Sequence, residues 1–286
     1  MTITTSQAIE SICKRLNAAG IDSARLDARL IVADSVGVDI KDLINFSESC
    51  LSIQQLSKIE SKALARSKRQ PMDKIRGLRG FWDLEFLVTK DTMSPRPDSE
   101  ALIEAVIKLR PDRLSVQRIL DIGTGTGCLL LSLLKEYHRA WGLGIDKSEE
   151  AILVASTNAS AAKLCNRSSF IVGNWTNAID SLFDLVVANP PYIPTNDIET
   201  LDPEVALHEP RMALDGGEDG VTSYRLLANA LPKLLPPSGL VVFEIGHGQA
   251  NTVNSLMESR GFKCLLVEKD LGGIPRALCY AAEIFT

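Results

Sequence analysis

Residues 119–127 have the sequence ILDIGTGTG, in which a short apolar run leads into a turn with three glycines. The pattern from Gly127 to Tyr137 then predicts a helix. Glycine permits a tight turn and a close approach of a ligand, and a helix N-terminus offers free N–H groups. The glycines follow G-x-G-x-G and not the phosphate-binding G-x-G-x-x-G. The stretch predicts a ligand-binding strand–turn–helix unit, with a purely structural turn as the alternative.

Strands and helices are predicted to alternate around this unit. The predicted strands cover residues 118–122, 141–145, 170–172, 185–188, 240–245, 264–268 and 277–282. The predicted helices cover residues 127–137, a segment that ends at 161, and residues 223–235 and 250–260. This alternation predicts an α/β fold with a Rossmann-like, doubly wound and mostly parallel sheet.

The N-terminal part of the chain has a different period. Residues 1–75 have apolar residues at helix spacing, and we expect a small helical bundle for substrate recognition or scaffolding. Gly20 and Gly37 are the predicted ends of the first two helices. Ser52 and Gln55 form a candidate capping box at the start of the third.

A linker is predicted between the two parts. Apolar and polar residues alternate within Gly80–Lys90, which predicts a strand, and Pro95 and Pro97 then exclude a helix. We therefore expect a strand or hairpin linker at residues 76–97 and a Rossmann-like domain at residues 98–286.

The composition excludes several classes of protein. The chain has 286 residues, 45% hydrophobic residues and a net charge of −5, which suits a globular protein and disfavours bulk binding to nucleic acid. The six cysteines contain no C-x-x-C pair, which predicts reduced thiols. The three histidines are far apart and offer no metal-ligand spacing. We find no signal-peptide pattern and no long apolar run, so we expect a cytoplasmic protein without membrane contact.

Two acids accompany the glycine turn, and together they favour a nucleoside cofactor. Asp121 precedes the turn, and Asp146 ends the next strand, where this architecture places an acid that binds ribose hydroxyls. The spacing does not separate NAD from S-adenosylmethionine, but two acids without a phosphate motif favour the latter. The predicted cofactor-binding residues are Asp121, Gly123, Thr124, Gly125, Thr126, Gly127, Asp146, Asn174, Trp175 and Asn189.

Asn174 and Trp175 follow another predicted strand at the same edge of the sheet. An asparagine there can hydrogen-bond the adenine amino group, and a tryptophan can pack against a ring. A core tryptophan that closes the end of the sheet is the equal alternative.

The chemical motif is Asn189-Pro190-Pro191-Tyr192, directly after the predicted strand 185–188. Two prolines stiffen the loop, so that the Asn189 side chain and the Pro190 carbonyl present two fixed acceptors to an NH2 group. This grip orients a weakly nucleophilic nitrogen toward a sulfonium methyl group, while Tyr192 packs over the planar group. We predict catalytic roles for Asn189, Pro190 and Tyr192, and substrate contacts for these three residues and Pro191. A Pro-Pro turn with an asparagine cap is the structural alternative.

The glycine turn, Asp146 and the Asn-Pro-Pro-Tyr motif together resemble amino-methyltransferases of the class I S-adenosylmethionine-dependent fold. The stretches GFWDLEF (residues 80–86) and PRPDSE (residues 95–100) narrow this likeness. With the helical N-terminal part, they resemble the bacterial peptide chain release factor N5-glutamine methyltransferase family, known as PrmC or HemK. Asn174 stands where that family usually has aspartate, which leaves a hydrogen-bonding side chain.

The resemblance implies a function that the residues alone leave open. The family transfers a methyl group from S-adenosyl-L-methionine to the glutamine of a Gly-Gly-Gln loop in release factors, with S-adenosyl-L-homocysteine as product and no metal. It implies release factors as protein partners, no direct nucleic-acid partner, and a monomer. By matching motif, Arg96 and Glu100 order the loop over the site, or form an interdomain salt bridge.

Three alternatives remain beside this reading of the motifs. The same four-residue motif serves the exocyclic amines of adenine or guanine in DNA or RNA. Against this stands the acidic segment that follows the motif, because it repels phosphate: Asp197, Glu199, Asp202, Glu204, Glu209, Asp215, Glu218 and Asp219. The second alternative is a cofactor-binding interaction protein with a decayed site. An NAD-dependent oxidoreductase is the third, without the expected glycine pattern.

Overall fold

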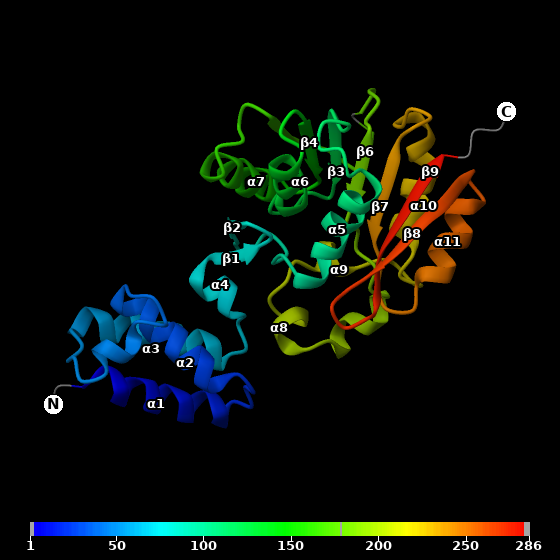
Figure 1. The fold of residues 1–286 in the computed structure, drawn as a ribbon. Coiled ribbons are helices and arrows are strands. Elements are labelled where there is room, and N and C mark those ends of the chain that lie inside the picture. Colours follow the sequence, from blue (N-terminus) through cyan, green and yellow to red (C-terminus); the bar gives the residue numbers. More distant parts are fainter. Residues whose placement is uncertain (1–2, 178, 283–286) are drawn as a thin grey trace. The chain divides into compact units, whose positions relative to one another are not determined.

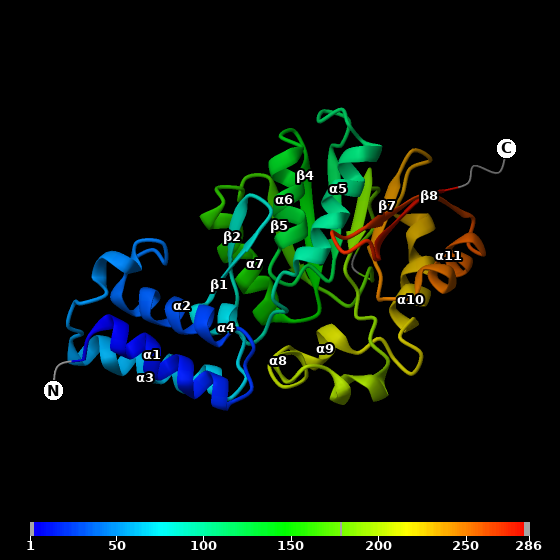
Figure 2. The same cartoon turned by 60° about the horizontal axis from the view of Figure 1, so that its bottom comes forward.

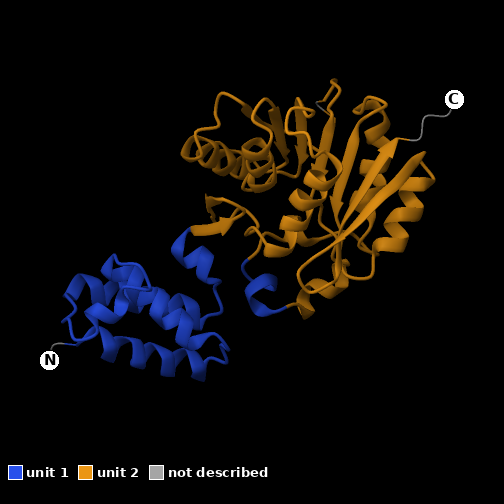
Figure 3. Ribbon diagram, viewed as in Figure 1, with its two compact units in different colours: residues 1–77, 202–208 blue, residues 78–201, 209–286 orange. Residues whose placement is uncertain are grey.

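The computed structural model describes residues 3–177 and 179–282. The chain divides into two compact units, coloured separately in Figure 3. The helical unit comprises Met1–Gly77 and Asp202–His208. The other unit comprises Leu78–Leu201 and Glu209–Thr286, and we call it the catalytic unit because it contains the motif that is expected to be catalytic. The short segment 202–208 therefore belongs to the helical unit, although its chain neighbours on both sides belong to the other.

The helical unit consists of short helices with defined ends. They are α1 (Thr5–Ala18), α2 (Ala24–Val36), η1 (Leu43–Phe46), α3 (Ile53–Ser67), α4 (Met72–Arg76) and, from the inserted segment, α8 (Pro203–Ala206). The predicted capping box is confirmed, because the Ser52 hydroxyl accepts from the Gln55 N–H and the Gln55 side chain accepts from the Ser52 N–H. Gly37 ends α2 in the left-handed region with a φ of 85°, as the sequence predicts.

A buried arginine joins three segments of this unit. Arg66 of α3 is 6% exposed and donates to Asp27 of α2 at 2.7 Å and to Glu204 of α8 at 2.9 Å. Arg69 adds a second contact to Glu204, at 2.8 Å. Asp27 is only 4% exposed, so the guanidinium group supplies the charge that this carboxylate requires away from water.

Of the two forms expected for the linker, the structure shows the hairpin and not a continuous strand over residues 80–90. Strands β1 (Leu78–Phe81) and β2 (Leu84–Leu87) pair antiparallel around a turn at Trp82. Trp82 has a φ of 51°, which a continuous strand does not allow. Glu100 accepts from the Trp82 N–H at 2.8 Å and thereby holds the turn.

The catalytic unit contains a seven-stranded sheet (Figure 1). Its strands are β3 (Arg118–Ile122), β4 (Trp141–Asp146), β5 (Ser168–Val172), β6 (Leu185–Ala188), β7 (Leu240–Glu244), β8 (Phe262–Lys269) and β9 (Pro275–Ala282). The order is β5-β4-β3-β6-β7-β9-β8, and among these described strands β9 alone runs in the opposite direction to the other six. The predicted doubly wound, mostly parallel sheet is confirmed.

Helices cover both faces of this sheet (Figure 2). One core contains residues of α5 (Glu100–Leu109), α6 (Cys128–Glu136) and α7 (Glu149–Ala161), and the other contains residues of α10 (Thr222–Ala230) and α11 (Ala250–Glu258). Successive residues of β6 alternate between the two cores, as the pleat requires: Leu185 and Val187 face the first, Val186 and Ala188 the second. The remaining helical turns are η2 (Pro97–Ser99), η3 (Thr195–Thr200), α9 (Arg211–Leu214) and η4 (Leu231–Lys233).

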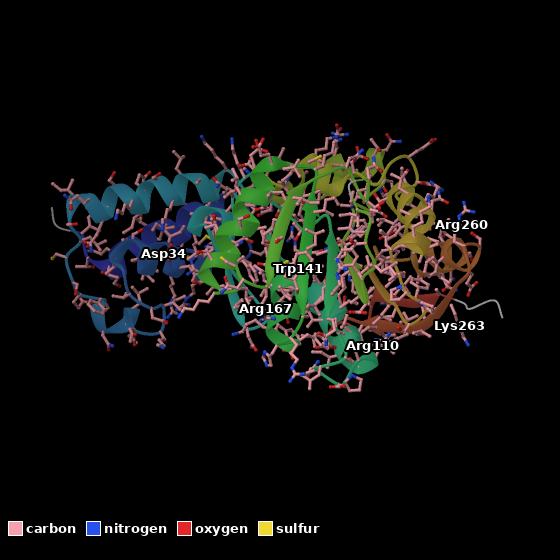
Figure 4. The ribbon with its side chains drawn as sticks, turned by 90° about the horizontal axis from the view of Figure 1, so that it is seen from above. Asp34, Arg110, Trp141, Arg167, Arg260 and Lys263 are labelled. Atoms are coloured by element: carbon pink, nitrogen blue, oxygen red, sulfur yellow. The ribbon has the colours of Figure 1, made fainter. Side chains whose placement is uncertain are left out.

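The strand order reverses between β3 and β6, which are parallel neighbours in the sheet. The glycine turn follows β3 and the Asn-Pro-Pro-Tyr loop follows β6, so both lie at this switch point, at the carboxyl edge. Figure 4 shows the sheet from the opposite edge, where Trp141 begins β4 and Arg167 precedes β5. No helix in the described ranges is long and apolar enough to cross a bilayer.

The arrangement around Arg66 predicts the effect of removing its charge. Arg66→Ala leaves Asp27 buried without its cation, and we expect the helical unit to lose about 3 kcal/mol of stability. Hydrogen–deuterium exchange of the α2 amides in the full-length chain measures this loss. Lys14→Ala is the matched control, because Lys14 forms an exposed pair with Glu10 and should leave α2 protected. Unchanged protection in the Arg66 variant would contradict the role of this ion pair.

Candidate functional site

A cavity of about 440 Å³ lies at the carboxyl edge of the sheet, within the catalytic unit. Most of the site residues predicted from the sequence form its wall: Gly123, Thr124, Gly125, Thr126, Asp146, Asn174, Trp175, Asn189, Pro190 and Pro191. Asp121, Gly127 and Tyr192 lie outside this wall. The structure thus brings the glycine turn and the proline loop, which are more than sixty residues apart in sequence, to one cavity.

The glycine turn has a backbone that other residues rarely adopt. Gly123, Gly125 and Gly127 have φ angles of 76°, 54° and 80°. The N–H groups of Gly123 and Thr124 donate to the Ile145 carbonyl at 2.8 and 3.0 Å, which anchors the turn to β4. A Cβ on Gly127 would lie 3.3 Å from the Ala155 side chain, so this glycine also allows close packing of α6 on α7.

Asp146 is held in place by backbone donors. Its Oδ2 accepts from the Gly125 N–H at 2.9 Å, and its Oδ1 accepts from the Ser148 N–H at 3.0 Å. Each carboxylate oxygen has a second lone pair, so the group retains acceptor capacity toward the cavity. The two sequence motifs are thus joined directly, because the acid that ends β4 accepts a hydrogen bond from the glycine turn that follows β3.

Asp121 is a buried carboxyl beneath the turn. It is fully buried, and its Oδ2 accepts from the Thr124 hydroxyl at 2.7 Å. Burial raises the pKa of this carboxyl to about 7, against the opposing effect of the Thr124 hydrogen bond. The contact to Thr124 makes Asp121 a support for the turn.

Asn174 and Trp175 lie on the cavity wall after β5. Trp175 has a φ of 55°, an unusual value for a bulky side chain. Its ring is half-buried and packs against the core that contains Ile122 and Ile145. The tryptophan therefore belongs both to the cavity wall and to the edge of the core.

The proline loop is fixed by side chains from other elements. The Asn189 side-chain Nδ2 donates to the Ser99 hydroxyl at 3.2 Å. The Pro191 carbonyl accepts from the Ser223 hydroxyl at 3.0 Å. The Tyr192 hydroxyl donates to Glu244 Oε1 at 3.3 Å, so this ring is directed toward β7. Tyr192 also lines a second, open hollow, separate from the main cavity.

Glu244 is a buried acid that the sequence analysis missed. It ends β7, is 1% exposed and accepts a hydrogen bond from the Ser99 hydroxyl. Burial raises its pKa to about 7, while the Ser99 hydrogen bond and the charge of Arg276 act in the opposite direction. The sequence offered one indication of its role, because a glutamate is unusual in a predicted strand that is otherwise apolar. Its hydrogen bond with Ser99 could not be predicted from the sequence, because the two residues are 145 positions apart.

Arg96 and Glu100 have separate contacts in the catalytic unit. Arg96 lines the cavity and lies 3.5 Å from Glu209, whose carboxylate also accepts from the Ser94 N–H. Glu100 accepts from the Trp82 N–H. Both residues thus order segments that flank the site, and the ion pair of Arg96 lies within the catalytic unit. Residues 3–177 and 179–282 contain no cluster of three or more potential metal ligands.

Family models match both parts of the chain. Residues 97–214 match the methyltransferase small domain, and residues 7–77 match the PrmC N-terminal domain. The second match lies within the N-terminal segment of the helical unit, and the first covers part of the other unit together with the inserted segment 202–208.

Curated relatives match nearly the whole chain. A release factor glutamine methyltransferase from Caulobacter vibrioides is 41% identical over 95% of this chain and 94% of its own. One from Rhodospirillum rubrum is 42% identical over 92% of this chain and 81% of its own. Among solved structures, the N-terminal domain of human METTL16 in complex with S-adenosylhomocysteine has a TM-score of 0.52 and 16% identity. It covers 82% of this chain and 85% of that one, and it shows the same methyltransferase fold.

The pKa of Asp121 predicts how stability depends on pH. Its folded pKa of about 7 exceeds the ordinary aspartate value of 3.8, so between these values the folded state holds a proton that the unfolded state releases. Stability from this group is therefore lost as pH rises toward 7. Asp121→Asn should reduce the decline in unfolding free energy between pH 5 and pH 8 by about 3 kcal/mol.

Chemical denaturation at both pH values measures this difference. Asp180→Asn replaces an exposed aspartate in the same unit and should follow the wild type. An Asp121→Asn variant with the wild-type pH dependence would refute the assigned protonation of the buried carboxyl.

Proposed function

Because the chain belongs to the release factor glutamine methyltransferase family, we propose that it methylates the side-chain amide nitrogen (N5) of a glutamine in release factors. The methyl donor is S-adenosyl-L-methionine, and the glutamine is that of the Gly-Gly-Gln loop. The observation that carries the proposal is the placement of the Asn189 loop and the glycine turn on one cavity wall. The sites for the methyl donor and the methyl acceptor thereby share one cavity at the switch point of the sheet.

The residues present fit S-adenosylmethionine. Asp146 has acceptor capacity for ribose hydroxyls, and the glycine turn permits close approach of the ligand. Asn174 offers a hydrogen-bonding group to adenine, and Trp175 offers a ring face. When bound, the cofactor supplies a methyl group on a positively charged sulfur, which leaves as the neutral thioether of S-adenosyl-L-homocysteine. No metal is required for this chemistry.

The proline loop orients the glutamine amide. The amide NH2 group has two hydrogens, and the loop offers two acceptors for them, Asn189 Oδ1 and the Pro190 carbonyl oxygen. The Asn189 Nδ2 is already bound to Ser99, which leaves Oδ1 for the substrate. Two fixed acceptors turn the nitrogen lone pair toward the methyl carbon and stabilise positive charge on nitrogen as the new bond forms. The extra proton then leaves the nitrogen for water, because an N-protonated amide is a strong acid.

The remaining parts of the proposal concern partners. We propose that the helical part, predicted at residues 1–75, recognises the protein substrate, and that the Rossmann-like part from residue 98 performs the transfer. Within the acidic segment after the motif, Glu204 and Glu209 are paired with arginines. The exposed acids Asp197, Glu199 and Glu218 of this segment suit a basic protein surface better than nucleic acid. We expect the enzyme to act as a monomer.

Asn189→Ala tests the central role in this proposal. The variant keeps the glycine turn and Asp146, so we expect cofactor affinity to change by no more than a few-fold. Methyl transfer should fall by at least about 100-fold, because the amide loses one of its two acceptors. Mass spectrometry of an unmethylated release factor measures transfer, and calorimetry measures cofactor binding. Asn251→Ala is the control, because it removes an exposed asparagine amide on α11 and should leave both methyl transfer and cofactor binding at the wild-type level.

The same assay separates the proposal from its alternative. The expected result is one added methyl group on the Gly-Gly-Gln glutamine. A folded, cofactor-bound wild-type enzyme that leaves the release factor unmodified would overturn the substrate assignment, and DNA and RNA would then be tested as acceptors. Wild-type transfer by the Asn189 variant would instead overturn the role of the side chain.

A further inference from the structure

Three side chains form a chain of hydrogen bonds beneath the proline loop. Glu244 of β7 accepts from the Ser99 hydroxyl, and the Ser99 oxygen accepts from the Asn189 Nδ2 at 3.2 Å. Ser99 and Glu244 are 2% and 1% exposed, so water does not compete for these contacts. All three residues belong to the catalytic unit.

The donor and acceptor in each of these hydrogen bonds follow from the number of hydrogens that each side chain carries. A serine hydroxyl has a single hydrogen, and an ionised carboxylate only accepts. While Glu244 is ionised, Ser99 must donate to it and can only accept from Asn189. The Asn189 side chain must then present its NH2 group to Ser99 and its Oδ1 away from it. Two buried residues thereby distinguish the two orientations of an amide whose oxygen and nitrogen have nearly the same shape.

We infer that Glu244, acting through Ser99, is a positioning residue that fixes the Asn189 amide with its oxygen toward the substrate. This inference rests on the proposed function, because it assigns Asn189 Oδ1 as an acceptor of the glutamine NH2. The same carboxylate binds the other end of the motif, since Glu244 Oε1 accepts from the Tyr192 hydroxyl at 3.3 Å. A single buried acid therefore holds both the first and the last residue of the loop.

The charged and titratable groups around Glu244 come from five other segments. Arg276 of β9 faces it and is itself bound to Asp98 of η2 at 3.0 Å. Tyr192 of the loop donates to the carboxylate, and Tyr224 of α10 donates to the Glu244 backbone carbonyl at 2.8 Å. Cys128 at the start of α6 is a weaker electrostatic neighbour. Arg276 is the one cation in this group, and it favours the ionised carboxylate.

Protonation of Glu244 reverses the direction of both hydrogen bonds, from Ser99 to Glu244 and from Asn189 to Ser99. A carboxylic acid proton on Oε2 can be donated to Ser99, whose hydrogen is then free for donation to Asn189. The Asn189 amide turns over, and its NH2 group faces the NH2 group of the substrate. Burial raises the pKa of Glu244 to about 7, so this reversal falls within an accessible pH range. Methyl transfer should therefore decrease as pH falls through about 7.

Glu244→Gln and Ser99→Ala test this inference in the full-length enzyme. The glutamine side chain has the shape of the protonated acid. Its oxygen takes the place of Oε1, which accepts from the Tyr192 hydroxyl, so its NH2 group faces Ser99 and should hold Asn189 in the reversed orientation. We expect its kcat at pH 8.5 to fall about 100-fold, with cofactor affinity and melting temperature retained. Ser99→Ala leaves the amide without a preferred orientation, and a smaller loss of about tenfold is expected. Both variants should lose the decrease below pH 7 that the wild type shows.

Two matched controls come from buried hydroxyls outside this network. Ser132 and Tyr280 are buried in the same unit, and their hydroxyls find no hydrogen-bond partner among the residues that the structure describes. Ser132→Ala and Tyr280→Phe should keep both the wild-type kcat and the wild-type pH profile. A loss of activity in these controls equal to that in Ser99→Ala would show that any buried hydroxyl has this effect, and would overturn the inference.

A second measurement does not depend on turnover. Proton–nitrogen NMR of the Asn189 side-chain amide, in protein labelled on asparagine, should show a shift with a midpoint near pH 7 in the wild type. Glu244→Gln should abolish this midpoint, and Ser132→Ala should retain it. If the wild type shows the midpoint but leaves release factors unmodified, the substrate assignment fails and the positioning role stands. The positioning role is overturned if the NMR signal of the Asn189 side-chain amide shows no midpoint near pH 7 in the wild type. It is also overturned if the Glu244→Gln enzyme keeps the wild-type kcat and pH profile.

Discussion

The reversal of strand order between β3 and β6 is the constraint on which the site depends. The connections after these two neighbouring strands leave toward opposite faces of the sheet, so a gap opens between them at the carboxyl edge. The glycine turn forms one side of this gap and the proline loop forms the other. Neither segment contains a complete site, because one supplies room for the cofactor and the other supplies acceptors for the amide.

Buried acids beneath both loops give this gap its rigidity. Asp121 lies under the glycine turn, and Glu244 lies under the proline loop, each with a pKa raised by burial. Such groups cost stability as isolated charges, and each is retained with a hydroxyl partner, Thr124 or Ser99. The two loops therefore rest on polar contacts inside an otherwise apolar sheet. This arrangement holds reactive groups in one orientation, where an apolar support would only fill space.

The sequence predicted the sheet well because its parallel strands are buried on both faces and appear as short apolar runs. The limits of β3 and β6 agree residue for residue with the prediction. Helix α10 ends at Ala230, earlier than the predicted residue 235, because Pro232 has no N–H and only a 3-10 turn follows. The turn at Trp82 was missed because a bulky residue with positive φ has no sequence signature. Ser99 and Glu244 escaped the site prediction because their contact joins distant segments, and only the three-dimensional fold brings them together.

The inserted segment 202–208 has a consequence for how the protein is made. The helical unit occupies the first 77 residues, yet its buried Arg66 receives one of its two carboxylates from Glu204. During synthesis, the ribosome must add more than a hundred further residues before this carboxylate leaves the exit tunnel. The helical unit is thus translated first, but its ion-pair network is complete only after residues 202–208 have been synthesised and have left the ribosome.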